Sequence, residues 1–535
     1  TVDGNFTYST LFFTVDGYVL NPAAGATLGA DAGIIDVAAA STATINVDLV
    51  GTNGLAKEGA GTLVLGGTNS FTGGLSINRG ILAVTQAAAL GADAVTVNGG
   101  AQTLRFTADM TVTNNINGVG VGYNIDTGAN TVTLEGSLSG GGADKFGSGT
   151  LVLNNATNAQ PNSLAVFAGT LIVNGGVQGG VGGAGASVIG GTGTVTGLVS
   201  TNGTLSPGVA PGQAGTLTAG SLVLGAGSTS LFDLGVVGVV GGTNDLMAVN
   251  GNLVLDGTLI VNPLAGWHIG TGSFRLFNYG GALTDSGLAL GGALLTPPAD
   301  VTYTVNTAIA GQVNLDIGYT GEFNWDGNGA PVDGIIEGGA GTWNGANTNW
   351  TNSDGLFNLA WVDSTATVAN FGGAAGGAVT VEGTRTFGTL NFTTGGYTLG
   401  GAGDLLMNGG IVNVTADIAT INVAINGVGG LTKNGAGELV LGTANGYTDG
   451  TTVNGGVLTM AANGATGTGT VTLADGTTLR STVDITHANA VNMLGTGTFD
   501  ILGAEFVQNG LVSGGLLLKS GAGRLTLANG ANAYA

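Results

Sequence analysis

The nine residues KEGAGTLVL, from Lys57 to Leu65, contain the pattern that decides the fold. The pattern K-x-G-x-G-x-L-x-L returns as KFGSGTLVL from Lys145, KNGAGELVL from Lys433 and KSGAGRLTL from Lys519. Two glycines mark a tight turn, and alternating leucines are typical of a strand with one buried face. Four copies in one chain predict a repeat architecture. The repeat-motif residues are Lys57, Gly59, Gly61, Leu63, Leu65, Lys145, Gly147, Gly149, Lys433, Gly435, Gly437, Lys519, Gly521 and Gly523.

A second short strand follows the motif at a nearly constant distance. The numbering separates Leu63 from Leu82 by 19 positions (82 − 63) and Leu151 from Leu171 by 20 (171 − 151). Coils of this length bury their apolar faces by stacking on one another. We therefore predict an all-β parallel solenoid of 19–20 residues per coil. Few helices are expected, and the only candidates are two short segments at residues 37–40 and 86–90. An antiparallel β-sandwich of repeated domains is the alternative, because regular strand spacing suits that fold as well.

A longer repeat encloses the short one. The sequence ATINV at Ala43 recurs at Ala419, an offset of 376 positions (419 − 43), and flanking matches give a unit of roughly 375–380 residues. We expect the natural protein to be longer at both ends. The predicted segments are 1–187 (solenoid of a first unit whose start is missing), 188–322 (its C-terminal β-rich part), 323–379 (a Trp-rich start of the second unit) and 380–535 (a second-unit solenoid truncated within the unit).

Composition and charge exclude several classes of partner. Glycine supplies 107 of 535 residues and charged residues only 8%, whereas 43% are hydrophobic, so the chain can bury a large core. The net charge is −22 and the ten basic residues are scattered singly, which disfavours nucleic acid. No apolar run of about 18 residues is present, and we expect no direct membrane insertion. The absence of cysteine predicts stability without disulfides.

Three stretches of the chain resemble a known family. They are residues 54–84 with their copy at 430–460, residues 203–261, and the segment FNWDGNGAPVDGIIEGGAGTWNGANTNW at 323–350. They are similar to the autotransporter-associated β-strand repeats, or passenger-associated transport repeats, of type V secreted proteins. The resemblance implies a right-handed parallel β-helix, export across an outer membrane, and an extracellular or cell-surface location in a Gram-negative-type bacterium.

The residues offer little for catalysis. The two histidines are His268 and His487, and the second aligns with Val112 of the first unit, so the repeat does not require it. Asp109 and Asp484 are equivalent across the units, but Asp109 has no acidic neighbour in its strand. The cations that a polysaccharide lyase needs to neutralise uronates are also too sparse in this chain. We therefore predict that the chain is not an enzyme and uses no cofactor.

Metal and ligand sites are weaker expectations. The calcium-roll repeat GGxGxDxUx is echoed only once each at residues 241–249 and 400–408. Oxygen ligation by Asp326, Asp333 and Asp354 remains a candidate calcium site. The four repeat lysines are interpreted as turn residues flanked by solvent, in preference to a ligand-binding stripe.

Four of the five tryptophans are concentrated in one segment: Trp325, Trp343, Trp350 and Trp361. We interpret them as a hydrophobic plug at the junction of two units, because the open end of a solenoid must be capped. An exposed aromatic platform for sugars is the alternative.

The leading functional hypothesis is a non-enzymatic extracellular structural protein, a section of a long surface fibre or matrix filament. Its expected partners are copies of itself end to end, or continuation of the same chain, and surface glycans. The alternative is an autotransporter-type adhesin passenger that binds a host cell or glycan, and a remote one is a polysaccharide-active β-helix enzyme.

Overall fold

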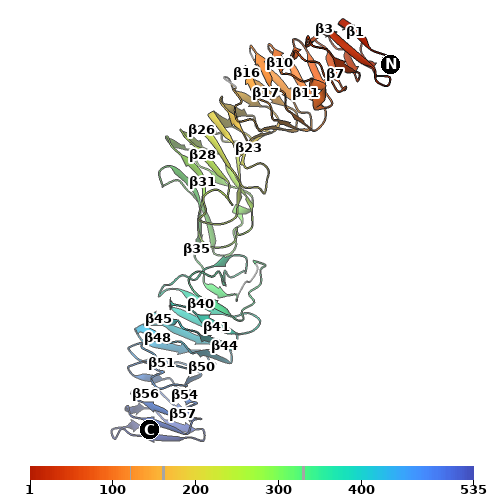
Figure 1. Cartoon of the computed structure of the whole chain (residues 1–535). Helices are drawn as coiled ribbons and strands as arrows, with labels where there is room; N and C mark the ends of the chain where they lie inside the picture. The colour runs from red at the N-terminus through yellow and green to blue at the C-terminus, as the bar shows by residue number, and fades with distance from the viewer. Residues whose placement is uncertain (121, 160–162, 328–331) are drawn as a thin grey trace. The chain divides into compact units, whose positions relative to one another are not determined.

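The computed structural model describes residues 1–120, 122–159, 163–327 and 332–535 (Figure 1). Strands make up 51% of the structure and helices 2%, and the strands stack as parallel coils of a β-solenoid with about 25 turns. The chain forms two compact units. Unit 1 contains residues 1–267, 272–296 and 303–316, and unit 2 contains residues 268–271, 297–302 and 317–535. The four segments predicted from the long repeat remain a prediction.

Unit 1 is built from parallel ladders, one on each face of its coils. The first ladder contains β1 (Phe6–Phe13), β3 (Thr27–Val37), β6 (Leu55–Glu58), β8 (Leu75–Ile77), β10 (Val95–Asn98), β13 (Ile116–Val119) and β16 (Leu138–Gly140), with β5 (Asp48–Val50) beside β3. The second contains β2 (Tyr18–Leu20), β4 (Thr42–Ile45), β7 (Thr62–Leu65), β9 (Ile81–Val84), β11 (Thr103–Phe106), β14 (Tyr123–Asp126), β17 (Ala143–Phe146), β19 (Leu164–Val166), β22 (Val181–Gly183), β24 (Thr194–Thr201) and β26 (Thr216–Leu224).

The third ladder of unit 1 contains β12 (Met110–Val112), β15 (Thr131–Leu134), β18 (Thr150–Leu153), β20 (Gly169–Val173), β23 (Ser187–Gly191), β25 (Thr204–Pro207), β27 (Thr229–Leu234), β30 (Thr258–Pro263) and β33 (Ala289–Leu290). Beyond β26, the second ladder continues through β28 (Leu246–Val249), β29 (Leu253–Leu255), β31 (Gly272–Tyr279) and β32 (Leu283–Asp285).

Unit 2 has two long ladders. One contains β39 (Asn358–Leu359), β38 (Trp350–Thr351), β36 (Phe323–Trp325), β40 (Val368–Phe371), β43 (Thr389–Phe392), β46 (Ile411–Val414), β49 (Leu431–Asn434), β51 (Thr451–Val453), β53 (Val471–Leu473), β56 (Val491–Met493), β59 (Val512–Gly514) and β62 (Ala533–Tyr534). The other contains β37 (Gly341–Trp343), β41 (Ala378–Val381), β44 (Tyr397–Gly400), β47 (Ile418–Ile421), β50 (Glu438–Leu441), β52 (Val457–Met460), β54 (Thr477–Ser481), β57 (Gly497–Ile501) and β60 (Leu517–Ser520). Both ladders are parallel except that β38 pairs antiparallel with both β36 and β39.

Two short ladders complete the coils of unit 2. They are β42 (Thr384–Thr386), β45 (Asp404–Asn408) and β48 (Ile425–Val428), and β55 (Ile485–His487), β58 (Glu505–Gln508) and β61 (Arg524–Leu527). The strands are short because a glycine or asparagine turn interrupts the chain at each corner. No helix in the described parts of the chain is long and apolar enough to span a membrane.

The core follows the alternation read from the motif. In β7 the side chains of Leu63 and Leu65 are buried, and Val64 between them is only partly covered. Leu63 pairs with Leu82 of the next coil and Leu65 with Val84, which confirms the predicted stacking. Each coil thus places aliphatic side chains directly on those of its neighbour, and this contact is the main source of solenoid stability.

The helices are the two short 3-10 segments η1 (Ala87–Leu90) and η2 (Gly292–Leu295) among the described residues. The first lies where a short helix is expected, at residues 86–90. A second expected helix, at residues 37–40, is wrong, since Val37 ends strand β3 and a turn with Ala40 at φ 60° follows. Val37 pairs with Phe13 of β1, and Ala38 N donates to Phe13 O at 2.9 Å, so bonding to the neighbouring coil outweighs the local preference of these alanines.

Candidate functional site

The lysine of the repeat motif is a buried group in three of its four copies. Lys57, Lys145 and Lys433 each have 0% of their surface exposed. Burial lowers the pKa of all three ammonium groups to about 8, because the charged form loses its hydration. A buried charge persists only when hydrogen bonds replace its hydration.

Backbone carbonyl oxygens supply those hydrogen bonds. The Lys433 Nζ donates to the carbonyl oxygens of Asn434 at 3.2 Å, Gly435 at 2.7 Å and Gly437 at 2.7 Å, all in its own turn. It also donates to Gly455 O at 2.8 Å, 22 residues along the chain in the next coil. The lysine side chain therefore ties one turn to the turn stacked on it.

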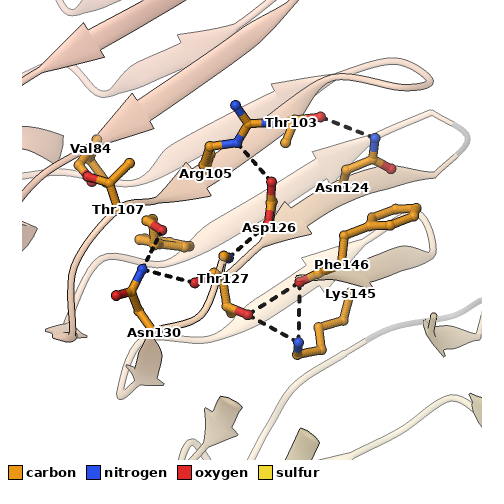
Figure 2. A network of polar contacts seen from close by, with 12 residues as sticks. Val84, Thr103, Arg105, Thr107, Asn124, Asp126, Thr127, Asn130, Lys145 and Phe146 are labelled. Carbon is orange, nitrogen blue, oxygen red and sulfur yellow. Dashed lines mark hydrogen bonds and ion pairs between the residues drawn. The ribbon is translucent and has the colours of Figure 1, made fainter. Parts of the chain in front are cut away.

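The same contacts recur in unit 1. Lys57 Nζ donates to Arg79 O at 2.9 Å, 22 residues later, and Lys145 Nζ donates to Ala168 O at 3.0 Å, 23 residues later. Figure 2 shows Lys145 also reaching back to Thr127 Oγ1, at 3.1 Å, on the preceding coil. The three lysines thus have one role, which we call the lysine staple.

The expectation that solvent flanks these lysines is wrong for Lys57, Lys145 and Lys433. A lysine next to a glycine turn is ordinarily exposed, but here the carbonyl groups of two successive turns converge on its ammonium group. Only Lys519 fits the expectation: its side chain is exposed and bonds Gly521 O at 2.6 Å.

The glycines of the motif are required by close approach between coils. Gly59 has φ +70°, and a methyl group on it would lie 2.1 Å from Val37 O of the preceding coil. Gly435 has φ +83°, and its methyl group would lie 2.2 Å from Val414 O. Any side chain at these positions would push the coils apart.

Side-chain ladders on the outer surface add to the bonds between coils. In unit 2, asparagine side chains donate in series from each coil to the coil before it, at 2.6–2.9 Å: Asn391 to Asn370, Asn413 to Asn391, Asn434 to Asn413 and Asn454 to Asn434. Sequence reasoning missed this asparagine ladder, although asparagines recurring at 20–22 positions were a readable signal.

Ion pairs run in the same direction, from coil to coil. Arg105 Nε donates to Asp126 Oδ2 at 2.8 Å, as Figure 2 shows. The other oxygen of this carboxylate, Asp126 Oδ1, accepts from Gly128 N at 2.9 Å. Arg480 lies between Glu438 and Asp500, with its Nε 2.7 Å from Asp500 Oδ2. Arg105 and Arg480 thus connect strands of stacked coils.

The four tryptophans from 325 to 361 are packed together in unit 2. Trp350 lies at the centre of the cluster, with ring centroids 5.0 Å from Trp325, 5.3 Å from Trp343 and 4.8 Å from Trp361. All four side chains are buried, as is Phe371, which packs against them. A buried cluster offers no exposed platform for sugars, and its place at the first strands of both long ladders suits the capping of this coil stack.

The three aspartates named as calcium candidates have separate backbone contacts. Asp326 is 2% exposed and its Oδ1 accepts from Glu337 N at 2.8 Å. Asp333 accepts from Ile335 N at 3.0 Å, and Asp354 accepts from Ala299 N at 2.8 Å. Within the described ranges, no group of three or more histidine or acidic side chains is arranged to hold a metal ion. Calcium binding at these three residues stays a prediction.

The carboxylate at Asp245 organises a loop of unit 1. Its Oδ1 accepts from Gly215 N and its Oδ2 from Asp233 N, both at 2.7 Å. The adjacent Asn244 accepts from Gly235 N at 2.7 Å and donates to Val239 O at 2.8 Å. Residues 241–249, which resemble a single calcium-roll repeat, thus use the side chains of Asn244 and Asp245 to bond backbone groups of the surrounding loop.

His487 is a buried structural residue. Its Nε2 lies 2.9 Å from Thr466 Oγ1 and its Nδ1 2.7 Å from Gln508 Oε1. Burial lowers its pKa, although the bond to Gln508 opposes that shift. With both ring nitrogens bonded in the core, His487 has none free for a substrate.

A shallow open groove of about 360 Å³ lies on unit 1. It is lined by Asp285, Gly287, Leu288, Leu290, Tyr303, Thr304, Val305 and Thr307. The Tyr303 ring stacks on Trp267 at 5.7 Å, and the Thr307 hydroxyl donates to Asp285 Oδ2 at 2.9 Å. An aromatic ring beside a carboxylate and hydroxyl groups is a polar–apolar combination that fits a small polar ligand.

Comparison with known proteins agrees with this architecture. The passenger-associated-transport-repeat family matches residues 55–84, 144–177, 431–460 and 517–535. Each of these matches contains one copy of the K-x-G-x-G motif, and the first three contain a buried lysine staple. These four segments are thus similar to passenger-associated transport repeats, and the chain resembles the passenger of an autotransporter.

The passenger-like chain is also similar to one curated protein, the "Adhesin BmaC autotransporter" of Brucella suis biovar 1 (strain 1330). The two are 38% identical over 320 residues. The alignment covers 56% of this chain and 9% of the relative, so the chain spans only a small part of that protein's length.

Proposed function

We propose that this chain is a non-enzymatic stalk section of a secreted, cell-surface adhesin of the autotransporter type. The observation that carries the proposal is the bonding between coils. Parallel ladders, lysine staples and the asparagine ladder all connect one coil to the next. Such bonding makes a solenoid a stiff spacer, because each coil is held by its neighbours along the axis. The name of the relative supports the adhesin part of the proposal.

The polar groups of the chain support a structural role over catalysis. The Arg480 guanidinium is held between two carboxylates, and both nitrogens of His487 are bonded in the core. The buried Asp326 offers its carboxyl group to neighbouring residues and not to a cleft. A general acid or base must reach its substrate within hydrogen-bonding distance, and these groups lie beneath other atoms.

In this function the stalk continues into the rest of the same polypeptide, and its surface stays free of strong lateral contacts. A net charge of −22 keeps parallel stalks apart on a crowded surface. End-to-end association with other copies is the second arrangement that we propose. Surface glycans are the partner class of the assembled adhesin.

The experiment replaces residues 1–535 in the full-length protein with an unrelated β-solenoid of equal coil number. A second variant deletes the section. The deletion should leave surface display intact and reduce cell attachment, because the spacer is shortened. The unrelated solenoid should restore attachment to the level of the natural protein. A replacement that is displayed but does not restore attachment would contradict the stalk, since the section would then bind a ligand itself.

The groove at Asp285 and Tyr303 favours a second candidate function, direct contact with a neutral glycan. The exposed Asp285 and the stacked Tyr303 ring supply a hydrogen-bond acceptor and an apolar face in one hollow. Tyr303→Ala in the full-length protein tests it. Attachment should fall if the groove binds, and should stay unchanged if the section acts only as a spacer.

A further inference from the structure

The first coil of unit 1 has an aromatic face that no strand covers among the described residues. Strand β1 lies at the end of its sheet and pairs with β3 on one side. At the start of β2, Tyr18 is 53% exposed, and its ring packs against Phe13 with the ring centroids 6.0 Å apart. An unpaired strand edge beside an exposed aromatic ring can accept a further strand of protein.

The long repeat contains the same coil a second time, inside unit 2. At an offset of 379 positions, Phe13 corresponds to Phe392 (392 − 13) and Tyr18 to Tyr397 (397 − 18). The two ring pairs have matching geometry, because their centroids are 6.0 Å apart at 53° in unit 1 and 6.2 Å apart at 51° in unit 2.

The strand pairing places both coils at the same distance from a lysine staple. In unit 1, β1 pairs with β3 and β3 pairs with β6, the strand that carries Lys57. In unit 2, β43 pairs with β46 and β46 pairs with β49, the strand that carries Lys433. The two coils are therefore equivalent in structure as well as in sequence.

In unit 2 this aromatic face is covered. The ring of Phe371, in β40, stacks on Phe392 at 4.9 Å and meets Tyr397 edge to face at 5.3 Å. The Tyr397 hydroxyl donates to Gly372 O at 2.6 Å and accepts from Gly339 N at 3.2 Å, and Tyr397 is only 1% exposed. The same face thus has a partner in unit 2 that the described part of unit 1 does not supply.

We propose that the first coil of unit 1 binds a tryptophan-rich segment equivalent to residues 323–379, supplied by a preceding part of the same polypeptide. In this arrangement the equivalent of Phe371 stacks on Phe13. A strand equivalent to β40 pairs with β1, as β40 pairs with β43 in unit 2. The Tyr18 hydroxyl gains backbone partners like those of Tyr397.

A preceding part of the polypeptide is a better source of this segment than a second copy of the chain. Residues 323–379 are already packed in unit 2, where the ring of Phe371 lies 4.9 Å from Phe392 and 5.5 Å from Trp350. All four tryptophans of the segment are buried there, so moving it onto a neighbouring molecule would expose them to water. The proposal does not depend on the stalk function, because its test measures burial of the coil and not attachment to cells.

The test compares hydrogen exchange of residues 6–20 in the chain 1–535 and in the full-length protein. The covered coil should exchange at least about tenfold more slowly in the full-length protein. Tyr18→Ala in the full-length protein should restore fast exchange, because the covered ring is lost. Phe12→Ala is the matched control and should keep exchange slow, because Phe12 is an exposed aromatic residue of the same coil whose counterpart Asn391 lies in the outer asparagine ladder.

A second arm of the test identifies the segment. Residues 323–379 are added directly before Thr1, so that Thr1 follows them as Thr380 does in unit 2. This extended chain should slow the exchange of residues 6–20 by the same factor as the full-length protein does.

Three results would overturn the proposal. Equal exchange of the coil in the chain 1–535 and in the full-length protein would show that the face stays open. Slow exchange in the full-length protein but not in the extended chain would assign the face to a segment of other chemistry. Exchange that slows in the chain 1–535 as its concentration rises would show that a second copy covers the face. The unsubstituted chains decide all three, even if Tyr18→Ala does not fold.

Discussion

The substitution Gly435→Ala tests whether the motif glycine is required by the approach of adjacent coils. Gly435 has φ +83°, which costs an alanine about 1–2 kcal/mol in left-handed strain. Its new methyl group would also lie 2.2 Å from Val414 O, so the turn must move by about 1 Å to reach ordinary contact. That shift weakens the hydrogen bond from Gly437 N to Val414 O, now 2.9 Å, and the bond from Lys433 Nζ to Gly435 O, now 2.7 Å.

The expected loss follows from these contacts. Two weakened hydrogen bonds cost about 0.5–1.5 kcal/mol each. Together with the backbone strain, Gly435→Ala should lose about 3–4 kcal/mol of local stability. Gly476→Ala is the matched control, because Gly476 has φ +74° and nothing within 4 Å of the added methyl group. The control should lose only the strain of about 1–2 kcal/mol.

Hydrogen exchange with peptide resolution measures this difference, since repeat proteins open locally. A difference of about 2 kcal/mol corresponds to roughly 30-fold faster exchange in the coil around Gly435 than in the coil around Gly476, each relative to wild type. Equal effects of the two substitutions would refute the reasoning, because φ alone would then account for both. An effect of Gly435→Ala that spreads evenly over unit 2 would also contradict a local origin.

Three further predictions address the other contacts between coils. Lys433→Ala removes the hydrogen-bond donor from the carbonyl oxygens of Gly435 and Gly455, and leaving each oxygen without a donor costs about 1–3 kcal/mol. Hydrogen exchange over residues 431–460 should therefore accelerate at least about tenfold. Lys519→Ala is the control and should leave exchange unchanged, because Lys519 is exposed. Folding lowers the pKa of His487 below its usual value of 6.5, so below that pH the unfolded chain binds more protons than the folded chain. The local stability around His487 should therefore be complete above about pH 6.5 and should fall as the pH is lowered. Hydrogen exchange measures this as the protection of residues 485–487 compared with the equivalent strand at residues 110–112. Asn391→Ala breaks two bonds of the asparagine ladder and should lower the urea midpoint by the equivalent of about 1–2 kcal/mol.

Each of these predictions has a clear contrary result. Unchanged exchange in Lys433→Ala would mean that the staple only balances the cost of burying a charge. Equal acid sensitivity at residues 110–112 and 485–487 would remove His487 as the cause, because the first strand carries Val112 in its place. A urea midpoint unchanged in Asn391→Ala would mean that water replaces the ladder bonds.

The sequence predicted the parts of the fold that depend on period. The alternation of Leu63 and Leu65 and the 19-residue distance to Leu82 are local or regular, so strand, face and register follow from them and are confirmed. The environment of Lys433 depends on Gly455 O, 22 residues away in another turn. No property of the motif alone shows that carbonyl groups of two turns converge on one ammonium group.

The candidate sites were predicted less well, for a similar reason. The aspartates at 326, 333 and 354 were grouped by composition, whereas the return of the chain at unit 2 brings Glu337 against Asp326. The concentration of tryptophans was visible in the sequence, but only side-chain packing shows that all four rings are buried together. Chain reversals and burial are set by tertiary contacts, which a single sequence does not report.

The lysine staple gives the solenoid a direction. Each buried copy bonds a carbonyl oxygen on its C-terminal side, at Arg79, Ala168 or Gly455, and Lys145 alone of the three also bonds Thr127 on its N-terminal side. Unfolding the coils from the C-terminal end therefore removes a carbonyl acceptor from a lysine whose own turn is still folded. Unfolding from the N-terminal end removes the lysine together with its turn. A pulling force applied from one end of the chain should therefore meet a different resistance at each of the three staples than a force applied from the other end.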